Sequence, residues 1–336
     1  MKKIICFGEL LLRMSPALNR QWIHDASMPV YVGGAELNVA TALAKWNAPI
    51  KYCSAIPDNY ITREIIEELT EKTIDVSSII FSGSKLGFYY LSQGADLKQG
   101  GVIYDRAYSS FWELKSGAIN WDEILNDVNW FHFSAISPAL NENVAAVCKE
   151  ALQVASSKNI TISVDLNYRA RLWQYSKHPT EIMPALVEHC DVMMGNIWSA
   201  NNLLGIDVDE NIHDKKSKSA YLDHATVTAH AIMQQFPKCK TVAQTFRFDH
   251  ENGIKYYAAL NDARQQYVSK KFYTDTVADK IGSGDCFMAG LIFGLYNRLS
   301  LQHTINYAAA AAFGKLHEIG DTTSQTVEDV EKIMNA

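Results

Sequence analysis

The sequence has few cysteines, no excess of basic residues and no long apolar run. Its six cysteines are scattered without a CxxC pair, so neither a disulfide framework nor a thiolate metal site is predicted, and we expect reduced thiols in a cytoplasm. The 31 Lys and Arg residues against 37 Asp and Glu give a net charge of −6, which argues against nucleic acid or an anionic membrane as a partner. No apolar run approaches the roughly 20 residues that span a bilayer.

Histidine ligand patterns and low-complexity segments are also missing. The ten histidines show no HExxH or similar spacing, so no metal-binding side chain is predicted. We find no internal repeat and no linker rich in Pro, Gly or Ser. One folding unit over residues 1–336 is therefore expected.

What the sequence does contain is an alternation of strand-like and helix-like segments. Strands are predicted near residues 2–9, 50–56, 130–137, 161–167, 192–197 and 241–246, and helices near 35–46, 61–72, 144–157, 286–299, 301–316 and 327–335. Such alternation favours right-handed crossovers and a mostly parallel sheet with helices on both faces. The predicted class is a three-layer α/β/α protein.

Two segments interrupt this alternation. Residues from about 13 to 34 and from about 81 to 110 have many aromatics and few helix signals, and KLGFYYLSQGADLKQGGVIYDRA is typical of a hairpin around a glycine-containing loop. Because both segments are rich in short strands, we expect them to pair into a small β-sheet that forms a lid over the α/β body.

The segment DKIGSGDCFMAG, residues 279–290, is the first candidate functional motif. Gly282, Ser283 and Gly284 supply permissive backbone and free amides at a predicted helix N-terminus, where a phosphate or a transferring phosphoryl group can bind. Asp285 would repel such an anion but can act as a base toward a hydroxyl that attacks phosphorus. The Walker and dinucleotide patterns do not fit, since no GK[ST] follows and Phe287 replaces a third glycine. A glycine turn with Asp285 as a simple helix cap remains an alternative.

A second glycine motif lies at YVGGAELNVATALAKW, residues 31–46. Gly33 and Gly34 allow the backbone to approach a ligand closely, and Asn38 lies one turn into the predicted helix. Taken together, GGxxxNxA and DxxGxGDxF resemble the two signatures of the ribokinase-like (PfkB) carbohydrate kinases, over essentially the whole chain. The resemblance implies a ribokinase-like fold, ATP and Mg²⁺ as cofactors, a monovalent cation as a further candidate, and Asp285 as the general base.

Three stretches resemble one branch of that family, the 2-keto-3-deoxygluconate kinases: YVGGAELNVA, VIYDRAYSS and SVDLNYRARLW. The resemblance implies that Tyr104, Arg106 and Arg169 hold an open-chain acid sugar, with Tyr89 as an additional lid contact. Gly33, Gly34 and Asn38 are expected to hold the same sugar. Guanidinium groups bind carboxylates in two-point geometry, which agrees with an acidic substrate. Surface arginines and lid packing by tyrosines are the alternatives.

Three positions depart from the family pattern. In GNIWSANN, Asn196 is kept but Ser199 stands where relatives have a Glu near the metal and phosphates. In AQTFRFDHENG the usual glycines are missing, and Thr245 and Arg247 are the candidates for nucleotide phosphates. Arg13 occupies about the position of a sugar-binding Asp; an arginine there suits an acidic sugar, although it can equally be a surface residue at a strand end.

The run from Ala308 to Ala312 leaves room for a flat ring beside the helix. In the family this region borders the adenine, and Asn306 is the candidate hydrogen-bonding partner. Tight helix packing by alanines is the alternative.

The predicted reaction is transfer of the ATP γ-phosphoryl group to the 6-hydroxyl of 2-keto-3-deoxygluconate. The alternatives are another acceptor on the same fold, 2-keto-3-deoxygalactonate or fructose, and a non-catalytic sugar or nucleotide sensor. The exposed strand edges of the lid predict a homodimer.

Overall fold

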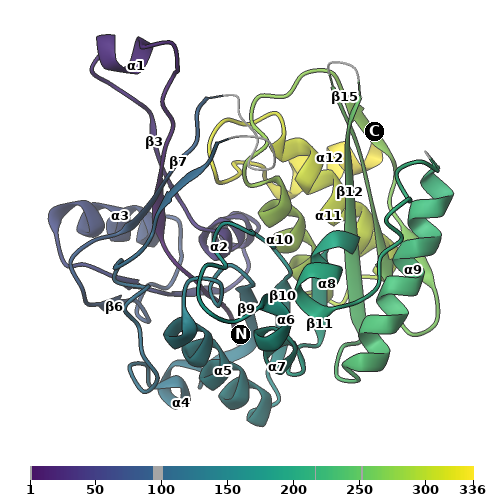
Figure 1. Cartoon of the computed structure of the whole chain (residues 1–336), viewed down its shortest axis with the longest axis horizontal. Helices are drawn as coiled ribbons and strands as arrows, with labels where there is room; N and C mark the ends of the chain where they lie inside the picture. Colours follow the sequence, from purple (N-terminus) through teal and green to yellow (C-terminus); the bar gives the residue numbers. More distant parts are fainter. Residues whose placement is uncertain (1, 94–100, 216, 251–252) are drawn as a thin grey trace.

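The main feature of the computed structural model, which describes residues 2–93, 101–215, 217–250 and 253–336, is a large sheet with helices on both faces (Figure 1). Its strand order is β14-β13-β12-β11-β10-β9-β1-β4, with β15 paired to β13. The strands from β4 to β12 in this order are parallel, whereas β13, β14 and β15 are antiparallel additions. The strands are β1 (Lys3–Phe7), β4 (Ile50–Cys53), β9 (Val128–Ser134), β10 (Thr161–Asp165), β11 (Val192–Gly195), β12 (Thr241–His250), β13 (Gly253–Asn261), β14 (Gln266–Val268) and β15 (Phe272–Thr274).

Two hydrophobic cores lie on opposite faces of this sheet. In β1, Ile4 and Cys6 belong to one core and Ile5 and Phe7 to the other, because successive side chains of a strand point to opposite faces. The first core is covered by α2 (Ala35–Lys45), α3 (Tyr60–Glu71), α10 (Ser283–Tyr296), α11 (Leu301–Lys315) and α12 (Val327–Asn335). The second is covered by α4 (Trp121–Ile124), α5 (Glu142–Ser157), α6 (Pro179–Ile182), α7 (Pro184–Val187), α8 (Ile197–Leu204) and α9 (Lys218–Gln235). The predicted three-layer arrangement is confirmed.

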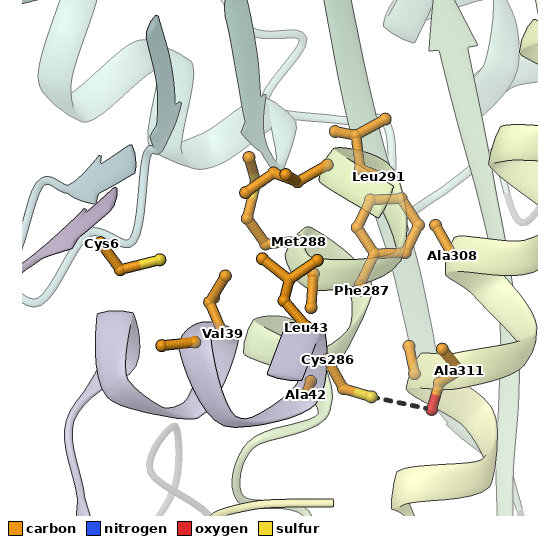
Figure 2. Packing of buried hydrophobic residues seen from close by; sticks show 14 of the residues in the cluster. Cys6, Val39, Ala42, Leu43, Cys286, Phe287, Met288, Leu291, Ala308 and Ala311 are labelled. Atoms are coloured by element: carbon orange, nitrogen blue, oxygen red, sulfur yellow. Dashed lines mark hydrogen bonds between the residues drawn. The ribbon is translucent and has the colours of Figure 1, made fainter. Parts of the chain in front are cut away.

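Helix α10 is held between α2 and α11 (Figure 2). A Cβ at Gly290 would lie 2.6 Å from the Ala308 Cα, so the two helices approach as closely as glycine and alanine permit. The Cys286 thiol donates a hydrogen bond to the Ala311 carbonyl at 3.3 Å (Figure 2). All residues of Ala308–Ala312 are fully buried. The alanine run therefore serves helix packing, which was the alternative interpretation of that segment.

A second sheet has the order β3-β2-β7-β8 and lies beside the main sheet, with α1 (Gln21–His24) at its tip (Figure 1). Its strands are β2 (Leu11–Met14), β3 (Val30–Gly33), β7 (Gly87–Tyr90) and β8 (Ile103–Asp105). Strands β7 and β8 form the predicted hairpin, and β2 pairs with β7 in parallel. The two segments separated in the sequence therefore do pair into a small sheet, as predicted; residues 94–100 of the hairpin lie outside the described residues. Two further strands, β5 (Ala55–Ile56) and β6 (Ile80–Phe81), form a short parallel pair.

Among the helices of the described ranges, none combines the length and the apolar character that crossing a bilayer requires.

Candidate active site

The candidate site is a cavity of about 310 Å³ between the small sheet and the carboxyl ends of β10, β11 and β12. Ligands of open α/β sheets collect at this edge. The cavity is lined by most of the residues predicted from sequence: Gly34, Asn38, Tyr89, Tyr104, Arg106, Arg169, Asn196, Thr245, Gly282, Ser283, Gly284 and Asp285. Gly33 and Asn306 are not among its lining residues.

The N-terminus of α10 forms one wall of the cavity. Gly282 is its N-cap, with φ +76°, and no side chain caps this end of the helix. A Cβ at Gly282 would lie 2.0 Å from the Asp321 carbonyl oxygen, so only glycine fits there. Gly284 has open space around it, and the Ser283 hydroxyl is turned away to donate to the Ala312 carbonyl at 2.9 Å. The first-turn amides therefore remain available for an anion.

Asp285 lies in the first turn of α10, beside these amides. Its carboxylate accepts a hydrogen bond of 2.7 Å from the Asn38 amide, which reaches across from α2. Burial raises the pKa of Asp285 to about 7, although the Asn38 hydrogen bond and the charge of Arg169 act in the opposite direction. A carboxyl group with this pKa can accept a proton near neutral pH.

Asp165, at the end of β10, is a buried cavity residue that the motifs did not single out. Burial, and then the charge of Asp285, raise the pKa of Asp165 well above its ordinary value. The two buried carboxyl groups disfavour each other's ionisation, and the charge of Arg169 compensates only part of this effect. The Asp165 carboxylate is an oxygen ligand of the kind Mg²⁺ prefers, and a bound divalent cation would favour its ionised form, so this residue fits Mg²⁺.

Four side chains form a row across the small sheet, because their positions are paired in register: Tyr31, Arg13, Tyr89 and Tyr104. The Arg13 guanidinium lies 4.2 Å from the Tyr31 ring centre and forms ion pairs with Asp279 at 2.9 Å and Asp321 at 2.6 Å. Tyr89 donates to the other Asp321 oxygen at 3.0 Å. The surface interpretation of Arg13 is therefore wrong: only 3% exposed, it connects the small sheet to the loop before α10 and to the loop between α11 and α12.

Gly33 belongs to the same contact. A Cβ there would lie 2.6 Å from the Asp321 Oδ2, so Gly33 makes room for a protein carboxylate and does not line the cavity. Its neighbour Gly34 does line it, with φ +138°.

Arg106 lines the cavity but is also bound to a protein carboxylate. Its guanidinium is paired with Glu9, which follows β1, and its Nε donates to Oε2 at 2.5 Å. The Ser109 hydroxyl donates to the other oxygen of Glu9 at 2.5 Å. Part of the hydrogen-bonding capacity of Arg106 is therefore used within the protein.

Arg169 differs from Arg106 in this respect. Its Nη1 donates to the Tyr168 carbonyl at 3.1 Å, and no carboxylate in the described ranges lies within ion-pair distance of it. Its charge lowers the pKa values of Asp285 and Asp165, so it lies near both. Arg169 is thus a partly buried cation that a ligand carboxylate can pair with.

The predicted nucleotide residues are only partly gathered here. Asn196 caps α8, where its side-chain oxygen accepts from the Ser199 amide at 2.8 Å and the Ser199 hydroxyl at 3.2 Å. Ser199, Thr245 and Arg247 also line the cavity. Asn306 lies in α11, and its side-chain oxygen accepts from the Lys270 amide at 3.2 Å, outside the cavity lining.

Several cavity residues were missed from sequence: Glu9, Glu36, Asp165 and Asp321. Glu36 is buried and accepts from the Ser134 amide at 2.9 Å and its hydroxyl at 2.6 Å. The available signal was an acidic residue at or just beyond the end of a buried strand: Asp165 is the last residue of β10, and Glu9 is two residues beyond β1. Asp321 lies in a loop and gave no such signal.

The fold and the site, with uncapped amides at a helix N-terminus beside a buried carboxyl group, favour an enzyme that transfers a phosphoryl group to a small hydroxylated molecule. The chain matches the family described as pfkB family carbohydrate kinase over residues 1–244. It belongs to that family and is a carbohydrate kinase.

Individual relatives agree with this assignment. The chain is 28% identical to the 2-dehydro-3-deoxygalactonokinase of Haloferax volcanii, over 99% of this chain and 96% of the relative. The crystal structure of 2-dehydro-3-deoxygluconokinase from Thermotoga maritima is 31% identical, with a TM-score of 0.89 over 100% of this chain and 98% of the other. A putative ribokinase II from E. coli, solved with ATP and Mg²⁺, is 17% identical with a TM-score of 0.78, over 100% and 99% of the two chains, and supports the fold alone.

Proposed function

We propose that this kinase transfers the γ-phosphoryl group of ATP to the 6-hydroxyl of 2-keto-3-deoxygluconate (2-dehydro-3-deoxygluconate). The observation that carries the proposal is Arg169, a cation without a carboxylate partner in the described residues, in the same cavity as Asp285. A neutral sugar would leave this charge partly buried and unpaired, which is costly. A sugar acid supplies the missing carboxylate.

In the proposed reaction Asp285 accepts the proton of the 6-hydroxyl as its oxygen attacks phosphorus. The amides of Gly282, Ser283 and Gly284 stabilise the negative charge of the transferring group. Asn38 orients the Asp285 carboxylate through the 2.7 Å hydrogen bond. Arg169 holds the substrate carboxylate, and Tyr89, Tyr104, Arg106 and Gly34 enclose the sugar chain.

The nucleotide would extend over Asn196, Thr245 and Arg247. The described residues bring together no group of three His, Cys, Asp or Glu side chains suited to a metal. Mg²⁺ would therefore be held mainly by the phosphates, with Asp165 as its protein ligand. When bound, the cation neutralises phosphate charge and polarises the phosphoryl group.

The experiment that tests this function is ADP release with MgATP over a panel of acceptors: 2-keto-3-deoxygluconate, its galactonate epimer, fructose, ribose and a nucleoside. Turnover mainly on the two keto-deoxy acids is the expected result. The epimer is the second candidate, since a relative from Haloferax volcanii is named for it. Turnover on fructose alone would contradict the role of Arg169, and ATP binding without any turnover would favour a sensor.

The pH dependence of turnover follows from Asp285. Because the pKa of this base is raised to about 7, its acceptor form is lost as the pH falls below that value. We expect kcat/KM for the sugar to decrease by about tenfold per pH unit below pH 7. Initial rates between pH 5 and pH 9 measure this. A profile that stays flat down to pH 5, with the protein folded, would contradict a base with this pKa.

We further propose that the small sheet acts as a lid and that two copies pair through it. Closure would exclude water and limit ATP hydrolysis. Strands β3 and β8 are its edges, and the apolar side chains of Leu18, Ile23, Val30 and Ile103 are each at least half exposed on it. Edges of this kind favour pairing with a second copy.

The six free, buried cysteines fit a reducing cytoplasm.

A further inference from the structure

A buried lysine lies behind the N-terminus of α10. Lys315, the last residue of α11, is 0% exposed, whereas lysine is almost never fully buried unless it is paired. Its ammonium donates hydrogen bonds to two backbone carbonyls, those of Glu318 at 3.0 Å and Gly320 at 2.9 Å. In the described part of the chain no carboxylate lies within 4.0 Å of this ammonium. Its direct partners are therefore carbonyl oxygens.

The turn that binds the ammonium is connected to the candidate anion site. The Ala278 amide donates to the Leu316 carbonyl at 2.8 Å, and the Gly320 amide donates to the Asp279 carboxylate at 3.3 Å. The Lys315 Cε lies 3.3 Å from where a Cβ of Gly282 would be. The lysine therefore supports the turn of residues 316–321 directly against the N-cap of α10.

The Lys315 ammonium has the charge and the carbonyl partners that a bound monovalent cation would have. Burial lowers the pKa of Lys315, and the neighbouring carboxylates oppose that effect: Asp279, Glu318 and Asp321. Backbone carbonyls at a turn are also the ligands by which proteins bind K⁺ without its hydration shell. An ammonium with three donors can satisfy the same oxygens.

We propose that Lys315 is a positioning residue that replaces a monovalent cation, so that this kinase needs no K⁺. The carbonyls of Glu318 and Gly320 already have a cationic partner, and the monovalent cation named from the family resemblance does not fit beside it. The fixed charge holds the turn against Gly282 and so keeps the first-turn amides of α10 in place. The kinetic part of this proposal rests on the proposed phosphoryl transfer; the stability part does not.

The experiment compares the wild-type protein, Lys315→Ala and Lys315→Met in KCl, NH₄Cl and tetramethylammonium chloride at equal ionic strength. Lys332→Ala is the control, because Lys332 is on the next helix with a side chain 77% exposed. Thermal melting and kcat are measured for each. In tetramethylammonium, Lys315→Ala should melt roughly 5 °C or more below wild type and lose about tenfold or more in kcat.

Rescue by small cations separates this role from ordinary packing. K⁺ or NH₄⁺ should restore at least half of both losses in Lys315→Ala. Lys315→Met should not respond, because its side chain fills the space that the ion needs. Wild type and Lys332→Ala should change by less than about twofold in kcat.

Three results would overturn the proposal: K⁺ activating the wild type severalfold, no response of Lys315→Ala to any small cation, or equal rescue of both variants. If neither variant folds, the kcat of the wild type in the three salts tests the proposal by itself, since activation by K⁺ would overturn it. If neither K⁺ nor NH₄⁺ raises the melting temperature of Lys315→Ala, the cation role itself is refuted. If small cations raise the melting temperature of Lys315→Ala but the wild type shows no turnover, the proposed phosphoryl transfer is refuted and the cation role is not.

Discussion

Asp285→Asn is expected to lower kcat by about 10³-fold, within the range of about 10² to 10⁴ found for general bases. The asparagine has nearly the same shape but cannot take the proton of the attacking hydroxyl. ATP affinity should stay within a few fold, because the amides of residues 282–284 are unchanged. Steady-state turnover with 2-keto-3-deoxygluconate and nucleotide binding by calorimetry measure the two effects.

The fold of this variant should be at least as stable as the wild type. The pKa of Asp285 is raised to about 7 from an ordinary value of 3.8. The folded state therefore loses stability as the pH rises from about 3.8 to about 7, and above pH 7 the full loss of at most about 4 kcal/mol remains. The variant avoids this cost, and its new amide can donate to the Asn38 Oδ1, which has no partner in the structure. At pH 8 its melting temperature should equal or exceed that of the wild type.

Asp122→Asn is a matched control, since Asp122 is also a first-turn acid but its side chain is 79% exposed. Its kcat should be unchanged. Asp285→Asn with turnover within tenfold of the wild type would remove Asp285 from the role of base.

Sequence patterns predicted the layers of this fold because those patterns are local. Apolar strands such as Lys3–Phe7 and the helix Ala35–Lys45 carry their own periodicity, and right-handed crossovers then set the parallel sheet. The antiparallel β13, β14 and β15 were not anticipated. These strands pair with near neighbours in the sequence, β13 with β12, β14 and β15. The available signals were the turn-forming pairs Asn252 with Gly253 and Asn261 with Asp262, which were not used in the prediction.

The candidate site could be predicted where the residues of a motif are close enough in the sequence for local structure to fix their relative positions. Gly282 to Asp285 form an N-cap and a first turn, so their relation is fixed within four residues. The partners of Arg13 are Asp279 and Asp321, 266 and 308 residues away. Contacts over that separation exist only once the small sheet is placed on the body.

The cavity charges explain why one of the two predicted arginines is the better candidate for the substrate carboxylate. Arg106 is paired with Glu9, and that pair is buried, so its removal would leave an uncompensated charge and destabilise the protein. A kinetic effect of substituting Arg106 would therefore combine folding and binding. Arg169 has no such protein partner in the described residues, and its substitution reports on the ligand.

Arg169→Ala is expected to raise the KM for 2-keto-3-deoxygluconate by about 30-fold, since a hydrogen bond to a charged group is worth roughly 2 kcal/mol. The KM for ATP should change less than about threefold, because the proposed nucleotide residues lie on β12 and α8. Steady-state kinetics with each substrate varied in turn measure both values. Arg171→Ala is the control: Arg171 is exposed, lies outside the cavity lining and donates to the Val102 carbonyl at 2.8 Å.

A second readout comes from the pH profile of the same variant. Arg169 lowers the pKa of Asp285, so its removal should raise that pKa and move the acid limb of kcat/KM to higher pH. The KM effect must therefore be measured near pH 9, where Asp285 is ionised in both proteins. An acceptor without a carboxylate should show the pH shift but not the KM effect. If the pH profile shifts but the KM for the acid sugar is unchanged, Arg169 lies near the base and does not bind the substrate carboxylate.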